Sequence, residues 1–167
     1  VIGGVAAGTS AAARAQRKLS DAEITIFEQD SDISYAGCGL PYYISDVVED
    51  RDDVVIYTPQ EFEEQKGPQV KSRQRVEEIL PDKKQLIVKD LTTEQKESVD
   101  FDKLLITTGA SPVVPPLPGI DLDNIFKLRN VNSADRIKNQ IQKPDTEQAV
   151  IVGGGYIGLE MAESLLK

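Results

Sequence analysis

One cysteine stands out among the residues that could do chemistry. Cys38 is the only cysteine of the 167-residue chain, and Gly37 and Gly39 flank it. These glycines keep side chains away from the sulfur, so a large planar partner could approach it. A helix beginning near Cys38 would favour the thiolate, the nucleophilic form of the side chain. Cys38 is therefore the candidate catalytic residue, and the alternative is a small buried apolar side chain, the commoner role of a free cysteine.

The absence of other reactive residue types restricts the chemistry. A dithiol–disulfide cycle within these residues is impossible with one cysteine, so Cys38 would form a mixed disulfide with a small thiol or a sulfenic acid. The chain contains no histidine. This excludes a Cys/His or Ser/His/Asp pair and a His-ligated zinc site, and we expect no metal.

Two glycine-rich turns lie 150 positions apart, and each follows an apolar segment and precedes a helical pattern. The second turn, 153–158, has the full G-x-G-x-x-G spacing, whereas the first turn, 3–8, has Val5 at the position of the middle glycine. Such a turn presents a helix N-terminus to a diphosphate and needs small residues near the phosphates. Glu28, at the end of the next apolar segment, suits a ribose hydroxyl pair. The pair predicts two dinucleotide sites, although glycines can also simply tighten strand-to-helix corners.

The elements that must position these groups follow from periodicity and capping signals. Thr58 and Pro59 have the types preferred at the N-cap and first position of a helix. The predicted helices are 7–19, one beginning near residue 38, 58–67, 133–143 and the segment after the second glycine turn. The predicted strands are 1–2, 23–28, three that suit a small antiparallel layer (69–79, 84–91 and 97–101), a buried strand at 103–111, and 149–152.

The fold class that these elements predict is α/β. We expect a Rossmann-like dinucleotide-binding domain with a small antiparallel layer over residues 1–112, followed at 113–167 by a linker and the start of a second such domain. The proline-rich segment 112–119 is the candidate linker. Because the chain opens directly before a glycine turn and closes within a helical pattern, we expect it to be part of a longer protein.

Charge and composition exclude several classes of partner. The net charge of −9 disfavours a nucleic-acid surface, which needs clustered Lys and Arg. No apolar stretch reaches membrane-spanning length. A single cysteine suits a reducing compartment, and we expect a cytoplasmic protein.

The motifs resemble a known family, the single-cysteine branch of the FAD-dependent pyridine nucleotide-disulfide oxidoreductases. Within it the chain is most similar to coenzyme A-disulfide reductases and to relatives described as NADH oxidases. The resemblance extends over the whole chain and depends on VIGGVAAG, SYAGCGLPYYI, VVEDRDDVVIYTPQEF, FDKLLITTGASPVVPPLPG, LRN and VIVGGGYIGLEMAE.

The resemblance implies FAD and NAD(P)H as cofactors and a homodimer as the full-length assembly. Cys38 would be the redox nucleophile beside the flavin. The residues it implies for FAD are Gly3, Gly4, Val5, Ala6, Ala7, Gly8, Glu28, Val76, Thr108, Gly109, Ala110 and Arg129. Those it implies for the nicotinamide nucleotide are Gly153, Gly155, Tyr156, Ile157, Gly158 and Glu160.

The substrate that the resemblance implies is a small-molecule disulfide, coenzyme A disulfide. The residues it places at the coenzyme A pocket are Ser10, Arg14, Arg17, Ser34, Gly37 and Lys66. Arg17 and Lys66 suit the phosphates of coenzyme A, and ordinary solvated surface charge is the alternative for both.

Four other functions stay open on the sequence. An NADH oxidase or peroxidase would cycle Cys38 through sulfenic acid, but relatives of that kind place a histidine where this chain has Ala6. A persulfide reductase would use the same cysteine with a further sulfur-transfer domain. A reductase of electron carriers such as ferredoxin would not need the cysteine. A non-catalytic flavin-binding fragment would fold without turning over.

Overall fold

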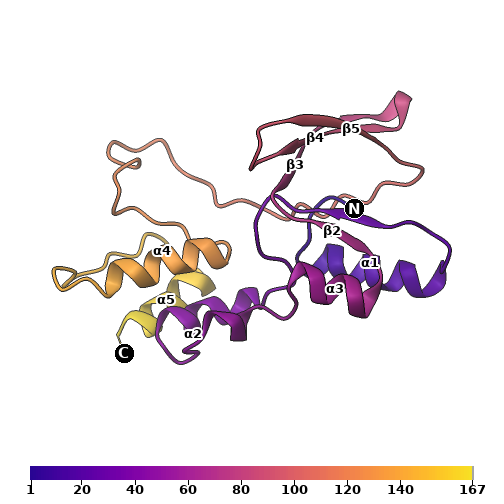
Figure 1. Ribbon diagram of the computed structural model, residues 1–167. Coiled ribbons are helices and arrows are strands. Elements are labelled where there is room, and N and C mark those ends of the chain that lie inside the picture. The colour runs from indigo at the N-terminus through magenta and orange to yellow at the C-terminus, as the bar shows by residue number, and fades with distance from the viewer. Residues whose placement is uncertain (167) are drawn as a thin grey trace. The chain divides into compact units, whose positions relative to one another are not determined.

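The computed structural model describes residues 1–166, which form two compact units (Figure 1). Unit 1 comprises Val1–Tyr35 and Val55–Gly109. Unit 2 comprises Ala36–Val54 and the chain from Ala110 onward. The chain therefore leaves unit 1 after Tyr35 and returns to it at Val55, and the segment between these residues contains the cysteine.

A parallel arrangement of short segments forms the centre of unit 1. Strand β1 (Thr25–Phe27) pairs in parallel with β2 (Gln69–Lys71), and on its other side Phe27 forms a parallel bridge with Ile2. Ile2 in turn bridges Ile106 in parallel. The chain start, β1 and β2 thus lie side by side, as expected of an α/β nucleotide-binding fold.

Two helices of unit 1 cover apolar residues of these strands. Helix α1 (Ala6–Lys18) is rich in alanine, which favours a helix and allows close packing on a sheet. Its Ala12 and Ala13 join one core cluster that also contains Phe62 of α3 (Pro59–Lys66). The predicted cap of α3 is confirmed, because the Thr58 side chain accepts a hydrogen bond from Glu61 N–H while the Glu61 carboxylate accepts from Thr58 N–H.

An antiparallel layer forms the rest of unit 1, as predicted. Its order is β3 (Gln74–Leu80), β4 (Gln85–Asp90) and β5 (Lys96–Asp100), and η3 (Pro81–Lys83) joins the first two strands. Leu86 and Val88 of β4 pack with Ile2 and Phe27 in a second core cluster.

The expectation of one strand over 69–79 is wrong. A turn at Ser72–Arg73, where Arg73 has a left-handed φ of 56°, splits the segment into β2 and β3. Because the chain turns there, the first part pairs in parallel with β1 and the second in antiparallel with β4.

The expected buried strand at 103–111 is reduced to one bridge. Ile2 N–H donates to the Leu105 carbonyl at 2.9 Å, and Thr107 N–H donates to the Ile2 carbonyl at 2.8 Å. Leu105 and Ile106 are nevertheless 40% and 57% exposed. Among the described residues the segment pairs with Ile2 alone, so its other edge lacks the partner that would bury it.

Unit 2 is helical. It contains η1 (Gly37–Gly39), α2 (Leu40–Ile44), η2 (Arg51–Val54), α4 (Val131–Ile141) and α5 (Tyr156–Leu165). The predicted helix at 133–143 is confirmed with an earlier start, because a capping box between Asn130 and Ser133 begins α4 at Val131. The helix predicted to begin near residue 38 is also confirmed, as η1 followed by α2.

The strand expected at 149–152 is not formed. Val150 and Val152 are each 88% exposed, and no described residue forms a ladder with them. A strand needs neighbours for its backbone hydrogen bonds, and residues 1–166 offer this segment none. The glycine turn and helix α5 that follow are present without it.

The mixed α/β class with a small antiparallel layer is confirmed. The boundary between residues 112 and 113 stays a prediction. Over residues 1–166, no helix is both long and apolar enough to cross a membrane. The same residues contain no group of three or more His, Cys, Asp or Glu side chains that could hold a metal ion.

Candidate cofactor and thiol sites

The first glycine turn is a tightly packed corner in unit 1. Gly3 has a left-handed φ of 98°, and a Cβ there would lie 2.4 Å from the Thr107 carbonyl oxygen. A Cβ on Gly8 would lie 1.8 Å from the Gly3 carbonyl oxygen. Gly4 is buried against side chains of β1 and Ile33. A side chain at Gly3 or Gly8 would force the backbone to move, and one at Gly4 would press on the Ile33 and Glu28 side chains, so packing requires small residues here.

The start of α1 is free of side-chain capping. Its N-cap residue is Val5, whose side chain has no hydrogen-bonding group, and the first turn contains no acidic residue. Thr9 donates its hydroxyl back to the Val5 carbonyl at 2.7 Å. The N–H groups and the positive end of a 13-residue helix are thus available to an anion beside the glycine turn.

Glu28 holds the turn from the end of β1. Its carboxylate accepts from Gly4 N–H at 2.7 Å and from Asp30 N–H at 2.9 Å, and the residue is 6% exposed. Each carboxylate oxygen keeps a second lone pair, so the group can still accept from a ribose hydroxyl. Glu28 therefore has a structural task, and its role at a ribose stays a prediction.

Thr107 helps to hold the first glycine turn, and the sequence did not predict this role. Its hydroxyl donates to the Ile2 and Gly3 carbonyls at 2.8 and 3.0 Å, which fixes the entry into the glycine turn. The only indication in the sequence was its position directly before Thr108, which was predicted to contact the cofactor.

The other residues predicted for FAD in unit 1 lie on its surface or partly inside it. Thr108 and Gly109 are exposed at the end of unit 1, and Val76 is half-buried in β3.

The second glycine turn, in unit 2, repeats the geometry of the first. Gly153 has a left-handed φ of 117°, and a Cβ on Gly158 would lie 2.1 Å from the Gly153 carbonyl oxygen. Gly155 is the N-cap of α5 and offers no side-chain cap. Three predicted nucleotide residues on α5 are exposed: Tyr156, Ile157 and Glu160.

Ala110 and Arg129 lie together in unit 2. The Arg129 Nε–H donates to the Ala110 carbonyl, so the arginine holds the chain that follows Gly109. Both residues are exposed. The predicted roles of this pair at the cofactor stay predictions.

Cys38 is exposed in η1, which excludes the alternative of a buried apolar cysteine. A Cβ on Gly37 would meet nothing within 4 Å, so the backbone beside the sulfur is open. The Gly39 N–H donates to the Ala36 carbonyl at 2.8 Å and closes the turn that presents the thiol. This is the accessibility that a thiol nucleophile needs.

Five of the six predicted substrate residues belong to unit 1. Ser10, Arg14 and Arg17 are exposed and, at spacings of four and three, share one face of α1. Lys66, at the end of α3, places its ammonium 4.8 Å from the centroid of the Tyr57 ring.

The ends of α1 and α3 lie next to each other. A Cβ on Gly67 would fall 2.9 Å from the Gln16 Cγ, so the residues flanking Arg17 and Lys66 are in contact. Ser34 has a left-handed φ of 49°, and its N–H donates to the Gly4 carbonyl at 3.0 Å. Gly37 belongs to unit 2 with Cys38.

Tyr43 is the titratable residue of unit 2 whose pKa its surroundings shift most clearly. Burial, then the hydrogen bond and charge of Asp135, raise the pKa of Tyr43 to about 12. The Tyr43 hydroxyl donates to Asp135 Oδ1 at 2.9 Å, so Tyr43 is a neutral donor at physiological pH. None of these residues was predicted, because nothing in their spacing joins position 43 to position 135.

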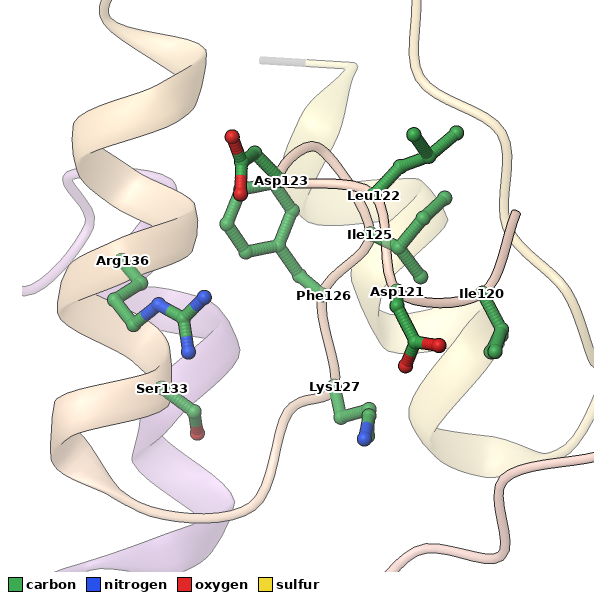
Figure 2. Close-up of a pocket in the computed structure, with 9 residues that line it drawn as sticks. All are labelled: Ile120, Asp121, Leu122, Asp123, Ile125, Phe126, Lys127, Ser133 and Arg136. Carbon is green, nitrogen blue, oxygen red and sulfur yellow. The ribbon is translucent and has the colours of Figure 1, made fainter.

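A shallow pocket of about 320 Å³ lies elsewhere in unit 2, between the loop 120–127 and α4 (Figure 2). The Arg136 guanidinium points toward the Phe126 ring, 5.8 Å from its centroid. The pocket contains none of the predicted site residues.

The family follows from comparison with known proteins. The family model described as pyridine nucleotide-disulphide oxidoreductase matches residues 1–167. The chain belongs to this family. The resemblance expected from the motifs is thereby confirmed as to family.

The relatives differ in their names. The chain is 40% identical over 165 residues to the coenzyme A disulfide reductase of Staphylococcus haemolyticus, and 38% identical over 167 residues to an NADH oxidase of Enterococcus faecalis. These matches cover 99% and 100% of the chain. The chain spans 37% of the length of each of these curated relatives.

Solved structures confirm the Rossmann-type oxidoreductase fold over almost the whole chain. The reduced Bacillus anthracis CoADR-RHD gives a TM-score of 0.95 at 37% identity, covering 99% of this chain and 30% of that one. A water-forming NADH oxidase from Lactobacillus brevis, solved with NADH bound, gives 0.92 at 32% identity, covering 98% and 36%. An NAD-dependent persulfide reductase from A. fulgidus gives 0.93 at 33% identity, covering 99% and 31%.

Proposed function

We propose that the protein containing this chain is an FAD-dependent NAD(P)H:disulfide oxidoreductase that reduces coenzyme A disulfide through Cys38. The observation that carries the proposal is one exposed cysteine, with glycines on both sides, in a chain with two glycine turns that each lead into a helix without a side-chain cap. The names of the relatives from S. haemolyticus and B. anthracis support the substrate.

The residues of the first turn fit the FAD diphosphate. A Cβ on Gly3 or Gly8 would meet backbone and one on Gly4 would press on the Ile33 and Glu28 side chains, so only small residues fit in this turn. Helix α1 begins without a side-chain cap. Glu28 keeps lone pairs for the ribose. The second turn, with the same geometry at Gly153 and Gly158, suits the diphosphate of NAD(P)H.

Cys38 would act as nucleophile and as leaving group in turn. Its thiolate sulfur attacks one sulfur of the substrate RSSR, which forms Cys38–S–S–R and releases RS⁻, and a proton from solvent gives RSH. FAD, when bound, supplies the electron pair that NAD(P)H delivers as hydride. Two-electron reduction of the mixed disulfide, with uptake of one proton, would break its S–S bond, release RSH and return the Cys38 thiolate. The sum is RSSR + NAD(P)H + H⁺ → 2 RSH + NAD(P)⁺.

The cationic side chains of α1 and α3 would bind the substrate. Arg14 and Arg17 share one helix face with Ser10, and Lys66 lies at the neighbouring end of α3. Such a group suits the phosphates of coenzyme A, in a chain whose net charge is otherwise negative.

An NADH oxidase or peroxidase is the second candidate, favoured by the name of the E. faecalis relative. It would cycle Cys38 through sulfenic acid. The chain has Ala6 and no histidine, so it offers no imidazole for peroxide chemistry. The name of the A. fulgidus relative supports a persulfide substrate as a third candidate.

Mass spectrometry of the full-length protein, isolated without reductant, tests the substrate. We expect a coenzyme A adduct on the peptide that contains Cys38, lost on treatment with dithiothreitol. The Cys38→Ser variant, which has no thiol to modify, is the control for adducts elsewhere. Added oxygen atoms on Cys38 with no thiol adduct would favour the oxidase, and added sulfur atoms would favour the persulfide reductase.

A further inference from the structure

The helical run that contains Cys38 is too short to hold itself in place. Leu40, at the junction of η1 and α2, has helical angles (φ −61°, ψ −40°), so Gly37–Ile44 is one continuous run. A run of this length in water is unstable on its own, because too few hydrogen bonds offset the cost of nucleation. The position of the thiol therefore depends on what the rest of the run contacts.

Helix α4 holds this run and the segment after it through two side chains on one face. Asp135 Oδ1 accepts from the Tyr43 hydroxyl at 2.9 Å, and Asp135 Oδ2 pairs with Arg51 Nε at 3.0 Å. Lys138, three residues further along α4, pairs its ammonium with Asp46 Oδ1 at 2.8 Å. All these residues belong to unit 2. Together Asp135 and Lys138 form the α4 clamp.

The α4 clamp is partly buried: the Asp135 side chain is 26% exposed and that of its partner Arg51 34%, while Asp46, the partner of Lys138, is 60% exposed. Lys138 is 8% exposed and Tyr43 7% exposed, and the Lys138 ammonium lies 4.0 Å from the centroid of the Tyr43 ring. The same ammonium donates to the Glu49 carbonyl at 3.4 Å. Removing Asp135 would take the acceptor away from the hydroxyl of the buried Tyr43, which costs more than losing an exposed pair.

We infer that Asp135 and Lys138 are positioning residues for the Cys38 thiol. They act through Tyr43, which lies within the helical run, and through Asp46 and Arg51 in the segment that follows the run. The inference rests on the proposed function of Cys38, and its physical content is that α4 fixes the orientation of Gly37–Ile44. Loss of the clamp would leave cofactor binding intact and misplace the sulfur, which slows steps that pass through it.

The first test is hydrogen exchange of the full-length protein, which does not depend on activity. In Asp135→Asn we expect amide exchange in peptides covering 36–54 to become at least tenfold faster, with β4 and β5 unchanged. Arg136→Gln is the matched control, because Arg136 is the next residue of α4 and its guanidinium faces Phe126 instead. Equal exchange in Asp135→Asn and the wild type would overturn the inference.

The second test separates steps that use the thiol from steps that do not. We expect Asp135→Asn to lower kcat for coenzyme A disulfide about tenfold, with the KM for NADH and the FAD content unchanged. Reduction of ferricyanide, which can take electrons from a flavin directly, should stay within twofold of wild type. A parallel loss of both activities and of FAD would assign Asp135 to folding alone and overturn the inference.

Two further variants complete the test. If Asp135 acts through Arg51, the effects of Asp135→Asn and Arg51→Gln on disulfide turnover should be clearly less than additive in the double variant, and additive effects would contradict that route. Cys38→Ser separates the two proposals. If it keeps disulfide reductase activity, the proposed function fails. If it is inactive while Asp135→Asn matches wild type, only the positioning role fails.

Discussion

Gly8 and Gly158 occupy equivalent places in the two glycine turns. Each lies in the first turn of its helix, directly against the carbonyl group of the first glycine of its turn. A Cβ would lie 1.8 Å from the Gly3 carbonyl oxygen in one turn and 2.1 Å from the Gly153 carbonyl oxygen in the other. Contacts this short are with backbone, so a substitution must move the turn itself. The missing middle glycine of the first turn, Val5, does not change this geometry.

Gly8→Ala should therefore abolish FAD binding while Gly158→Ala spares it. We expect Gly8→Ala to lose most of its flavin absorbance and about 1–3 kcal/mol of stability from overpacking. Gly158→Ala should keep the flavin and raise the KM for NADH at least tenfold. The control is Gly154→Ala, where a Cβ meets nothing within 4 Å. Full flavin content in Gly8→Ala, measured by absorbance after gel filtration, would contradict the assignment of the first turn.

The sequence predicted helix starts best, because the capping interactions that set them involve residues close together in the chain. Thr58 and Pro59 predicted the start of α3, and the observed capping box needs only residues within one turn. The strands at 103–111 and 149–152 were predicted wrongly, because a strand depends on neighbours that local pattern does not specify. For the same reason the sequence could name Cys38 and could not find Asp135, whose partners lie more than 80 positions away.

The contact between α2 and α4 should make the protein less stable as the pH rises in the alkaline range. Tyr43 is neutral in the folded protein, since burial and Asp135 raise its pKa to about 12 from an ordinary value of 10, with Arg51 opposing and Asp50 adding to the shift. Lys138 lies over its ring. The stability from this shift is complete below pH 10 and is lost as pH rises toward 12, because the unfolded chain ionises first.

Tyr43→Phe should remove that dependence. Between pH 9.5 and 11.5, the free energy of urea unfolding of the full-length wild type should fall by about 1.5 to 2 kcal/mol more than that of the variant, at 1.36 kcal/mol per pKa unit. Tyr42→Phe is a suitable control, because Tyr42 is the adjacent tyrosine and is 51% exposed. An identical pH dependence in wild type and Tyr43→Phe would show that Tyr43 is not a buried donor in solution.

At the scale of the whole molecule, each compact unit contains one glycine turn, and the unit with the second turn also contains the cysteine segment. The fold class and family could be predicted from the sequence, since both turns, the cysteine motif and the antiparallel layer leave local patterns. The substrate could not be predicted in the same way, because the chain spans 37% of the length of the two curated relatives and these have different names. The proposed function depends on electrons passing through the sulfur of Cys38.

Disulfide reduction by the full-length Cys38→Ser variant tests that dependence most directly. NAD(P)H oxidation would be followed with coenzyme A disulfide and, separately, with ferricyanide as a direct acceptor from the flavin. We predict that the variant keeps its FAD and its ferricyanide reductase activity and loses at least 99% of its disulfide reductase activity. Disulfide reduction at the wild-type rate would contradict the central claim.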